Sequence, residues 1–356
     1  MRTLFFFAIC ILSFSLMASD PAAKADSVIK TFAFDNNGPS MAVVIRKNDN
    51  VVFSSFSGYA DVQKKIHACA LTSYNIAGLS APIVAMGIMI LKDKKNLSYD
   101  EKIRDILPEL PEYTSQITIK NLLHQNSGLP DMKENEILAN TKILNEKAVL
   151  DYLHTFEELQ FIPGKKIDKN PINNILLSLI IEKKYGKPFS VFVQKEICLQ
   201  LGITGMVLAT GKKNKIKTKA TGYEMNGDSY IANTSTDKNT LYISSVYCSV
   251  QDYDKLMRAF TTTSLVSGAT IAEALSLNYI PSFFKFAAFG WDIMFNKGKS
   301  YYFQTGTGMG FTHIALIIPD EQLSIVIFTN RSGVMGLRRL AFNLINCFSS
   351  YGYIPE

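Results

Sequence analysis

The stretch Tyr74-Asn75-Ile76-Ala77-Gly78-Leu79-Ser80-Ala81-Pro82 and the apolar run from Ile83 to Leu91 predict a turn that leads into a buried helix. Pro82 suits the first helical turn, where a backbone N–H has no helical partner. The run is apolar on nearly every face, so we expect the helix to lie inside the protein, with Ser80 as its cap. Unpaired N–H groups at the mouth of such a helix favour negative charge, which makes the turn a candidate active site.

The composition is that of a folded, globular protein. The 356 residues are 47% hydrophobic and 19% charged, which excludes a disordered chain and allows one large domain or two moderate ones. The formal net charge is +6, and part of this excess lies in the basic run 212–219. The run favours a solvated loop, with attraction to an anionic cell-envelope polymer as the alternative. Aromatic residues do not interleave with it, so we expect no nucleic-acid partner.

The first 18 residues predict a secretory signal peptide. Arg2 precedes an apolar run from Leu4 to Met17, and small residues follow. Cleavage is expected after Ala18, or as late as Ala25. No second apolar run reaches the length of a membrane span, so we expect an exported, periplasmic or secreted protein without stable membrane insertion after cleavage.

Cysteine and histidine spacing gives no sign of a metal site, and we expect no metal and no cofactor. The cysteines after the leader are scattered widely, which favours buried free thiols over disulfides. We interpret His124 as a structural residue with turn contacts to Ser127 and Asp131. The direction of His313, toward a cleft or toward the opposite face, stays open. The residues in question are Cys69, Cys198, Cys248 and Cys347, with His67, His124, His154 and His313.

Strand patterns occur at both ends of the chain and helical patterns in the middle. We therefore predict an α+β fold in which both termini complete one antiparallel sheet, flanked by helices as an α/β/α sandwich, with an all-helical subdomain. The predicted organisation is a single domain over 26–350, with an α/β part at 26–95 and 285–350 and a mainly helical part at 96–284. Within the latter, the segment 206–240 is expected to be a polar loop. Strands are expected at 41–46, 51–55, 289–295, 300–304, 313–318 and 323–329, and helices at 118–124, 143–156, 172–184, 189–201, 252–260, 268–279 and 335–347.

Several short segments, in this order and spacing, resemble the serine β-lactamase and penicillin-binding protein superfamily. The similarity is to the class C β-lactamase and D-alanyl-D-alanine carboxypeptidase-like branch and covers about residues 38 to 347. None of the segments is decisive alone, but together they are specific. They are Ile76–Ser80, Lys95–Asp100, Leu107–Leu110, Leu122–Asp131, Phe161–Lys165, Leu201–Thr204, Thr221–Tyr223, Phe289–Trp291 and Thr305–Phe311.

The resemblance implies the β-lactamase/transpeptidase fold and an acyl-enzyme hydrolase. In that family a Ser-x-x-Lys at the mouth of the buried helix supplies the nucleophile and its base. A Tyr-x-Asn on a loop supplies a second proton carrier, and a Lys-Thr-Gly or His-x-Gly strand forms the far wall. Backbone N–H groups of the serine and of that strand form the oxyanion hole.

This chain departs from the family at every one of these side chains. Matching the motifs places Gly78 and Ala81 at the serine and lysine, Lys169 and Pro171 at the tyrosine and asparagine, and Gln304 at the wall cation. Thr305, Gly306 and Thr307 of the strand motif are kept. The N–H groups of Gly78 and Thr307 are therefore the part of the machinery that the sequence can still supply.

We therefore hypothesise an exported bacterial pseudoenzyme without serine acyl transfer, although the family is enzymatic. Its expected cleft consists of Gly78, Leu79, Ser80, Lys169, Gln304, Thr305, Gly306 and Thr307. The occupant would be a peptide-like or cell-wall-derived ligand, or a protein partner. The first alternative is an active β-lactamase, esterase or DD-peptidase with substitute residues such as Ser80 together with Lys169. Further alternatives are an interaction protein with a closed cleft and a decaying gene copy without a role.

Overall fold

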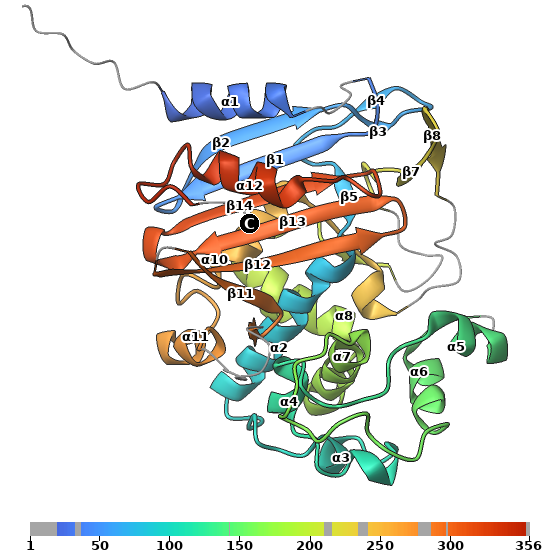
Figure 1. Cartoon of the computed structure of the whole chain (residues 1–356). Coiled ribbons are helices and arrows are strands. Elements are labelled where there is room, and N and C mark those ends of the chain that lie inside the picture. The colour runs from blue at the N-terminus through green and yellow to red at the C-terminus, as the bar shows by residue number, and fades with distance from the viewer. Residues whose placement is uncertain are drawn as a thin grey trace, which may run out of the picture.

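Strands from the two ends of the chain form one antiparallel sheet in the computed structural model (Figure 1). The structure describes residues 20–32, 37–141, 143–209, 216–233, 241–276, 286–296 and 298–353. Within these ranges the sheet has seven strands in the order β10-β11-β12-β13-β14-β1-β2. Its centre is the pairing of β1 (Met41–Lys47) with β14 (Leu323–Thr329), which joins segments close to opposite ends of the sequence.

Helices predominate in the middle part of the chain, between the strands of the first and last parts. The first part contains α1 (Pro21–Thr31), β1, β2 (Asn50–Ser57), β3 (Tyr59–Asp61), β4 (Ile66–His67), β5 (Ser73–Asn75), η1 (Ala77–Ser80) and α2 (Ala81–Asp93). The middle part contains α3 (Ile103–Ile106), η2 (Glu112–Thr114), α4 (Ile119–Leu123), α5 (Glu134–Asn140), α6 (Glu146–Leu153), α7 (Pro171–Tyr185), α8 (Phe189–Phe192), η3 (Val193–Cys198) and α9 (Leu199–Leu201).

Strands return in the last part. It contains β6 (Val207–Leu208), β7 (Tyr223–Asn226), β8 (Ser229–Ala232), η5 (Tyr242–Ser244), β9 (Val246–Ser249), α10 (Val250–Arg258), α11 (Gly268–Ala274), β10 (Phe286–Ala288), β11 (Trp291–Asn296), β12 (Lys299–Gly308), β13 (Phe311–Ile318), η6 (Pro319–Glu321), β14 and α12 (Leu337–Ile345). Among the described residues no helix combines the length and the apolar character needed to cross a membrane.

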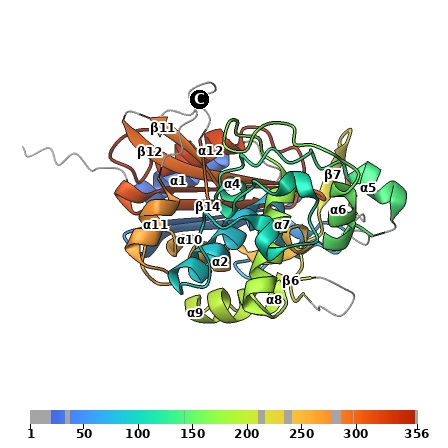
Figure 2. The ribbon, with the colours of Figure 1, turned by 90° about the horizontal axis from the view of Figure 1, so that it is seen from below.

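Both faces of the sheet are covered, so alternate side chains of its central strands enter two different cores. Along β1, Val43 and Ile45 lie in the core beneath α1 and α12. Ala42 and Val44 face the opposite way, into the larger core that contains α2 and α7. Figure 2 shows α2 crossing beneath the sheet, with α10 and α11 on one side of it and α5 and α6 on the other. The predicted antiparallel sheet with helices on both faces is confirmed.

Local sequence explains several element boundaries. Thr118 caps α4 in a capping box with Asn121, as the helix predicted at 118–124 requires. Gly202 ends α9 in the left-handed conformation, where a glycine has no steric penalty. The prediction of a loop over 206–240 was wrong in part, because β7 and β8 form a hairpin there. The first residues of the basic run, 212–215, and the predicted signal peptide lie outside the described residues, and so does the end of the helix expected at 268–279.

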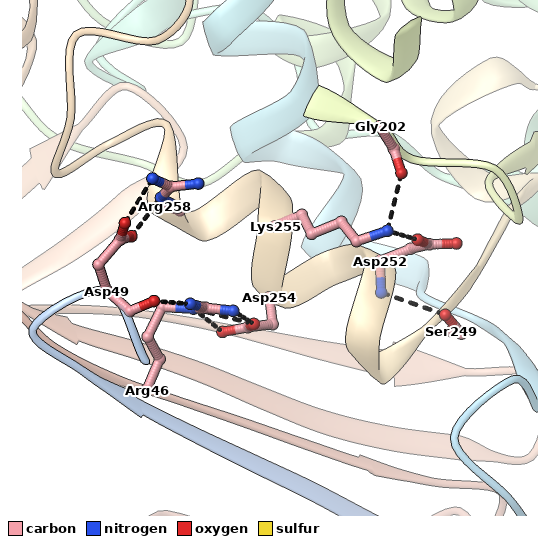
Figure 3. Close-up of polar contacts among 8 residues, drawn as sticks. All are labelled: Arg46, Asp49, Gly202, Ser249, Asp252, Asp254, Lys255 and Arg258. Carbon is pink, nitrogen blue, oxygen red and sulfur yellow. Dashed lines mark hydrogen bonds and ion pairs between the residues drawn. The ribbon is translucent and has the colours of Figure 1, made fainter. Parts of the chain in front are cut away.

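A group of charged side chains holds α10 against the sheet (Figure 3). Arg46 of β1 binds the carboxylate of Asp254 in α10, with Nη2 to Oδ2 at 2.6 Å. Asp254 is 3% exposed and Arg46 is 17% exposed. Burial raises the pKa of Asp254 even beside Arg46, so much of the attraction offsets the cost of burying the carboxylate. Nearby, Arg258 donates to Asp49 of the β1–β2 turn at 2.5 Å.

We expect Asp254→Ala to lower the free energy of unfolding by about 3–5 kcal/mol, because it leaves the Arg46 guanidinium buried without its partner. Asp151→Ala is the matched control, since Asp151 pairs with Lys147 on the surface, where the side chains are 64% and 79% exposed. The control should change stability by less than about 0.5 kcal/mol. Urea denaturation at neutral pH followed by circular dichroism measures both. Equal losses in the two variants would contradict a role for the buried pair.

Candidate functional site

The quoted turn forms a short helical segment, η1, that leads into α2. Ile83 to Leu91 are all buried, as the prediction of an internal helix requires. Pro82 lies in the first turn of α2, as expected. Ser80 does not cap the helix, and that prediction was wrong. Its own backbone is already helical (φ −71°, ψ −22°), so its side chain is not placed to reach the next N–H groups, and it makes no capping bond.

Buried polar groups hold η1 in place from behind. The Asn75 side chain accepts a hydrogen bond from the Ala77 N–H at 3.0 Å and donates one to the Ser244 carbonyl at 3.0 Å. His313 donates from Nε2 to the Asn75 carbonyl at 2.7 Å and accepts from the Thr329 N–H at Nδ1. Complete burial lowers the pKa of His313 to about 4, so the ring is neutral at physiological pH. His313 therefore braces the turn from inside the core, which answers the question of its direction.

The backbone of β12 lies directly against η1. A Cβ atom added to Gly78 would lie 2.7 Å from the Thr305 carbonyl oxygen, closer than real Cβ atoms approach. A Cβ atom on Gly306 would meet the Ile76 carbonyl in the same way. Gly290, at φ +87°, makes a similar contact with the start of α2. A side chain at position 78 thus requires η1 or β12 to move.

A cavity of about 690 Å³ opens where η1, the start of α7 and the sheet edge meet. All five positions at which the sequence lacks the family's catalytic side chains line it, namely Gly78, Ala81, Lys169, Pro171 and Gln304. Ser80 and Thr307 from the expected cleft also line it. Leu79, Thr305 and Gly306 do not: Leu79 is fully buried in the core, and the other two belong to the contact between β12 and η1.

Lys169 and Gln304, the two large polar side chains that the sequence placed in the cleft, already have partners within the chain. Lys169 forms an ion pair with Asp292 of β11, which joins the start of α7 to the sheet. Gln304 donates to the Gly290 carbonyl at 2.6 Å and accepts from the Thr305 N–H at 2.9 Å. In neither of these contacts does the side chain pair with a serine hydroxyl, as the base of a serine hydrolase does. Among the described residues, Lys169 is the only amine that lines the cavity.

Sequence reasoning missed several residues that line the cavity. Asn174 and Ser244 are two of them. Like the side chain of Ser80, which the sequence did place in the cleft, their side chains make no hydrogen bond within the described part of the chain, so all three can contact a ligand. Trp291, the single tryptophan of the chain, also lines the cavity and is 1% exposed. Asn173 and Asn174 are neighbours in the predicted helix, and only the folded structure shows that Asn174 is the one that faces the cavity. Further lining residues that the sequence did not indicate are Glu134, Asp292, Met132, Leu138, Leu144, Leu241 and Ile243.

No histidine or cysteine of the described residues lines the cavity. His124 is buried, and its Nδ1 lies 2.9 Å from the Ala287 carbonyl. The predicted contacts with Ser127 and Asp131 were wrong, because the ring turns toward the sheet and packs edge-on against Phe289. The four cysteines within the described residues are free, but only Cys198 and Cys248 are buried, whereas Cys69 is exposed. Among the described residues no group of three or more acidic, histidine or cysteine side chains has a geometry that would hold a metal ion.

Known proteins share this sequence pattern and fold. Protein flp of Staphylococcus aureus (strain MRSA252) is 25% identical over 335 residues, 88% of this chain, and the chain spans only 64% of that relative's length. The octameric penicillin-binding protein homologue of Pyrococcus abyssi superposes with a TM-score of 0.79 at 20% identity, covering 92% of this chain and 76% of that one. A class C β-lactamase gives the same TM-score at 17% identity, covering 93% and 97%.

The family model described as Beta-lactamase matches residues 25–346, which include the whole sheet and the helices on both sides of it. These matches agree with the resemblance to the serine β-lactamase and penicillin-binding protein superfamily that the motifs carry. The chain belongs to the Beta-lactamase family.

Proposed function

We propose that this chain is a β-lactamase-like pseudoenzyme that binds a peptide-like or cell-wall-derived ligand and does not perform serine acyl transfer. The observation that carries the proposal is the cavity itself. Gly78, Ala81, Lys169, Pro171 and Gln304 lie together on its wall, so the changes of residue are concentrated where the family's chemistry takes place. Loss of both nucleophile and base removes the rate acceleration that depends on them.

The free polar groups of the cavity suit the amides of a peptide. Ser80 and Ser244 carry hydroxyl groups and Asn174 a carboxamide, each of which can donate and accept. The backbone N–H groups of Gly78 and Thr307 are the proposed binding site for a carbonyl oxygen. A volume of about 690 Å³ lies in the range of small-molecule sites. A protein partner that inserts a peptide segment would use the same groups.

We expect the wild-type protein to form no adduct with a fluorescent penicillin on a denaturing gel. The variant Gly78→Ser/Ala81→Lys should also stay unlabelled and lose about 1–3 kcal/mol of stability, because the new Cβ at position 78 collides with the Thr305 carbonyl. Gly268→Ala is the control, since a Cβ there meets nothing closer than 3.7 Å. Labelling of the wild type that disappears in Ser80→Ala would favour the active hydrolase instead. A stable, labelled double variant would show that η1 and β12 separate easily.

Binding can be followed through Trp291, because the single tryptophan lines the cavity. We expect N-acetyl-D-alanyl-D-alanine amide to change its fluorescence in a saturable way. Asn174→Ala should weaken this binding about threefold to tenfold by removing a neutral hydrogen bond. Asn343→Ala, the same substitution on the exposed face of α12, should bind as the wild type does. If peptides cause no change at millimolar concentration, the peptide-ligand proposal fails.

We also propose that the protein is exported to the periplasm or the medium and is cut after Ala18. Helix α1 begins at Pro21, is capped by Asp20, and has Ala25 fully buried, so a cut after Ala25 would divide it. N-terminal sequencing of protein recovered outside the cytoplasm of a bacterial host should therefore give Ser19 as the first residue. A first residue of Asp26, or recovery only in the cytoplasm with Met1 retained, would contradict this.

A further inference from the structure

One part of the cavity wall is apolar and is not used by the proposed contacts to peptide amides. We call Met132, Leu138, Leu144, Leu241 and Ile243 the apolar compartment. Leu144, Leu241 and Ile243 are buried, at 1%, 1% and 9% exposure. Met132 and Leu138 are only half-buried, although both pack against the main core. The compartment is therefore a formed part of the fold whose outer members still face solvent.

The apolar compartment and the ion pair between Lys169 and Asp292 involve different parts of the molecule. Leu138 lies on α5, at the right of Figure 1, whereas Asp292 and Trp291 lie on β11, at the left of the same view. Residues of both elements line one cavity. A ligand that fills it would therefore meet aliphatic side chains from one part of the wall and polar side chains from another.

The charges around the cavity argue against a carboxylate as the polar portion. Its ionisable lining residues among those described are Glu134, Lys169 and Asp292. Lys169 is already paired with Asp292, and Glu134 adds a second carboxylate. An anionic group would meet two negative side chains and one occupied ammonium, which disfavours its binding. The free groups of Ser80, Asn174 and Ser244 are neutral and match uncharged amides.

Covering the apolar compartment would be favourable because it removes exposed aliphatic surface from water. An aliphatic chain in contact with Met132 and Leu138 would release water from both surfaces. The gain at full burial corresponds to about a fourfold increase in affinity for each methylene. Peptide amides alone do not gain affinity from the burial of aliphatic surface. The occupant should therefore carry an aliphatic group.

We infer that the cavity takes an N-acylated peptide with an uncharged head, whose aliphatic acyl chain fills the apolar compartment. The inference rests on the proposed function, since it names the class of peptide-like ligand for the same cavity. The amide groups lie at Ser80, Asn174 and Ser244, and the acyl chain extends toward Leu138 on α5. The length of the acyl chain and the charge of the C-terminal group of the peptide are then the two ligand properties that determine affinity.

The test is a chain-length series of N-acetyl-, N-butanoyl-, N-hexanoyl- and N-octanoyl-D-alanyl-D-alanine amide, titrated through Trp291 fluorescence and by calorimetry. We expect the affinity to rise by at least tenfold from the acetyl to the octanoyl compound. The free acid of each compound should bind more weakly than its amide at neutral pH. Leu138→Ser should flatten the dependence on chain length. Leu199→Ser, at a position 73% exposed on α9, should leave it unchanged.

The outcomes separate the two proposals. If none of the four amides binds, the proposed function itself fails, and this inference fails with it. If the acetyl compound binds and longer chains bind no better, the proposed function stands and the acyl-chain inference is overturned. The inference is also overturned if Leu138→Ser and Leu199→Ser respond alike, because chain-length dependence would then reflect nonspecific adsorption. Free acids that bind better than amides would overturn the uncharged head.

Discussion

The backbone contact between β12 and η1 sets the position of everything around the cavity. Gly78 and Gly306 allow the two backbones to touch, and Gly290 allows the start of α2 to approach the sheet edge in the same way. Because protein interiors are close-packed, such a contact leaves a helix mouth and a strand little freedom to shift relative to each other. The cavity walls are then positioned by backbone, while the side chains that project from them are free to differ from those of related proteins.

Much of this fold follows from patterns that act over short distances. The apolar run from Ile83 to Leu91 can be satisfied only inside the protein, and a capping residue such as Thr118 marks its own helix. The hairpin of β7 and β8 escaped prediction for a physical reason. Five of its eight residues are exposed and only Tyr223 is buried, so the chain shows no alternation of buried and exposed side chains that a sequence pattern could reveal.

The site shows the same division between local and long-range information. Motif spacing identified Gly78, Lys169 and Gln304 because each lies a fixed number of residues from a segment that resembles the family. It could not identify Asp292 as the partner of Lys169, since that pair joins residues 123 positions apart. His124 illustrates the same limit: its contact with Ala287 depends on how the helical part meets the sheet. The apolar compartment also combines two segments separated by about a hundred residues, and only packing brings them together.

The pairing of β1 with β14 has a consequence for the order in which the protein is made and moved. Met41 pairs with Thr329, so the centre of the sheet cannot form until residue 329 has left the ribosome. Contacts between such distant residues slow folding, because the intervening loop must close first. Slow closure of the sheet is compatible with the export proposed above, because a chain that has not yet folded can pass through a narrow channel as an extended polypeptide. Under that proposal the sheet closes, with α1 laid over its outer face, after transport.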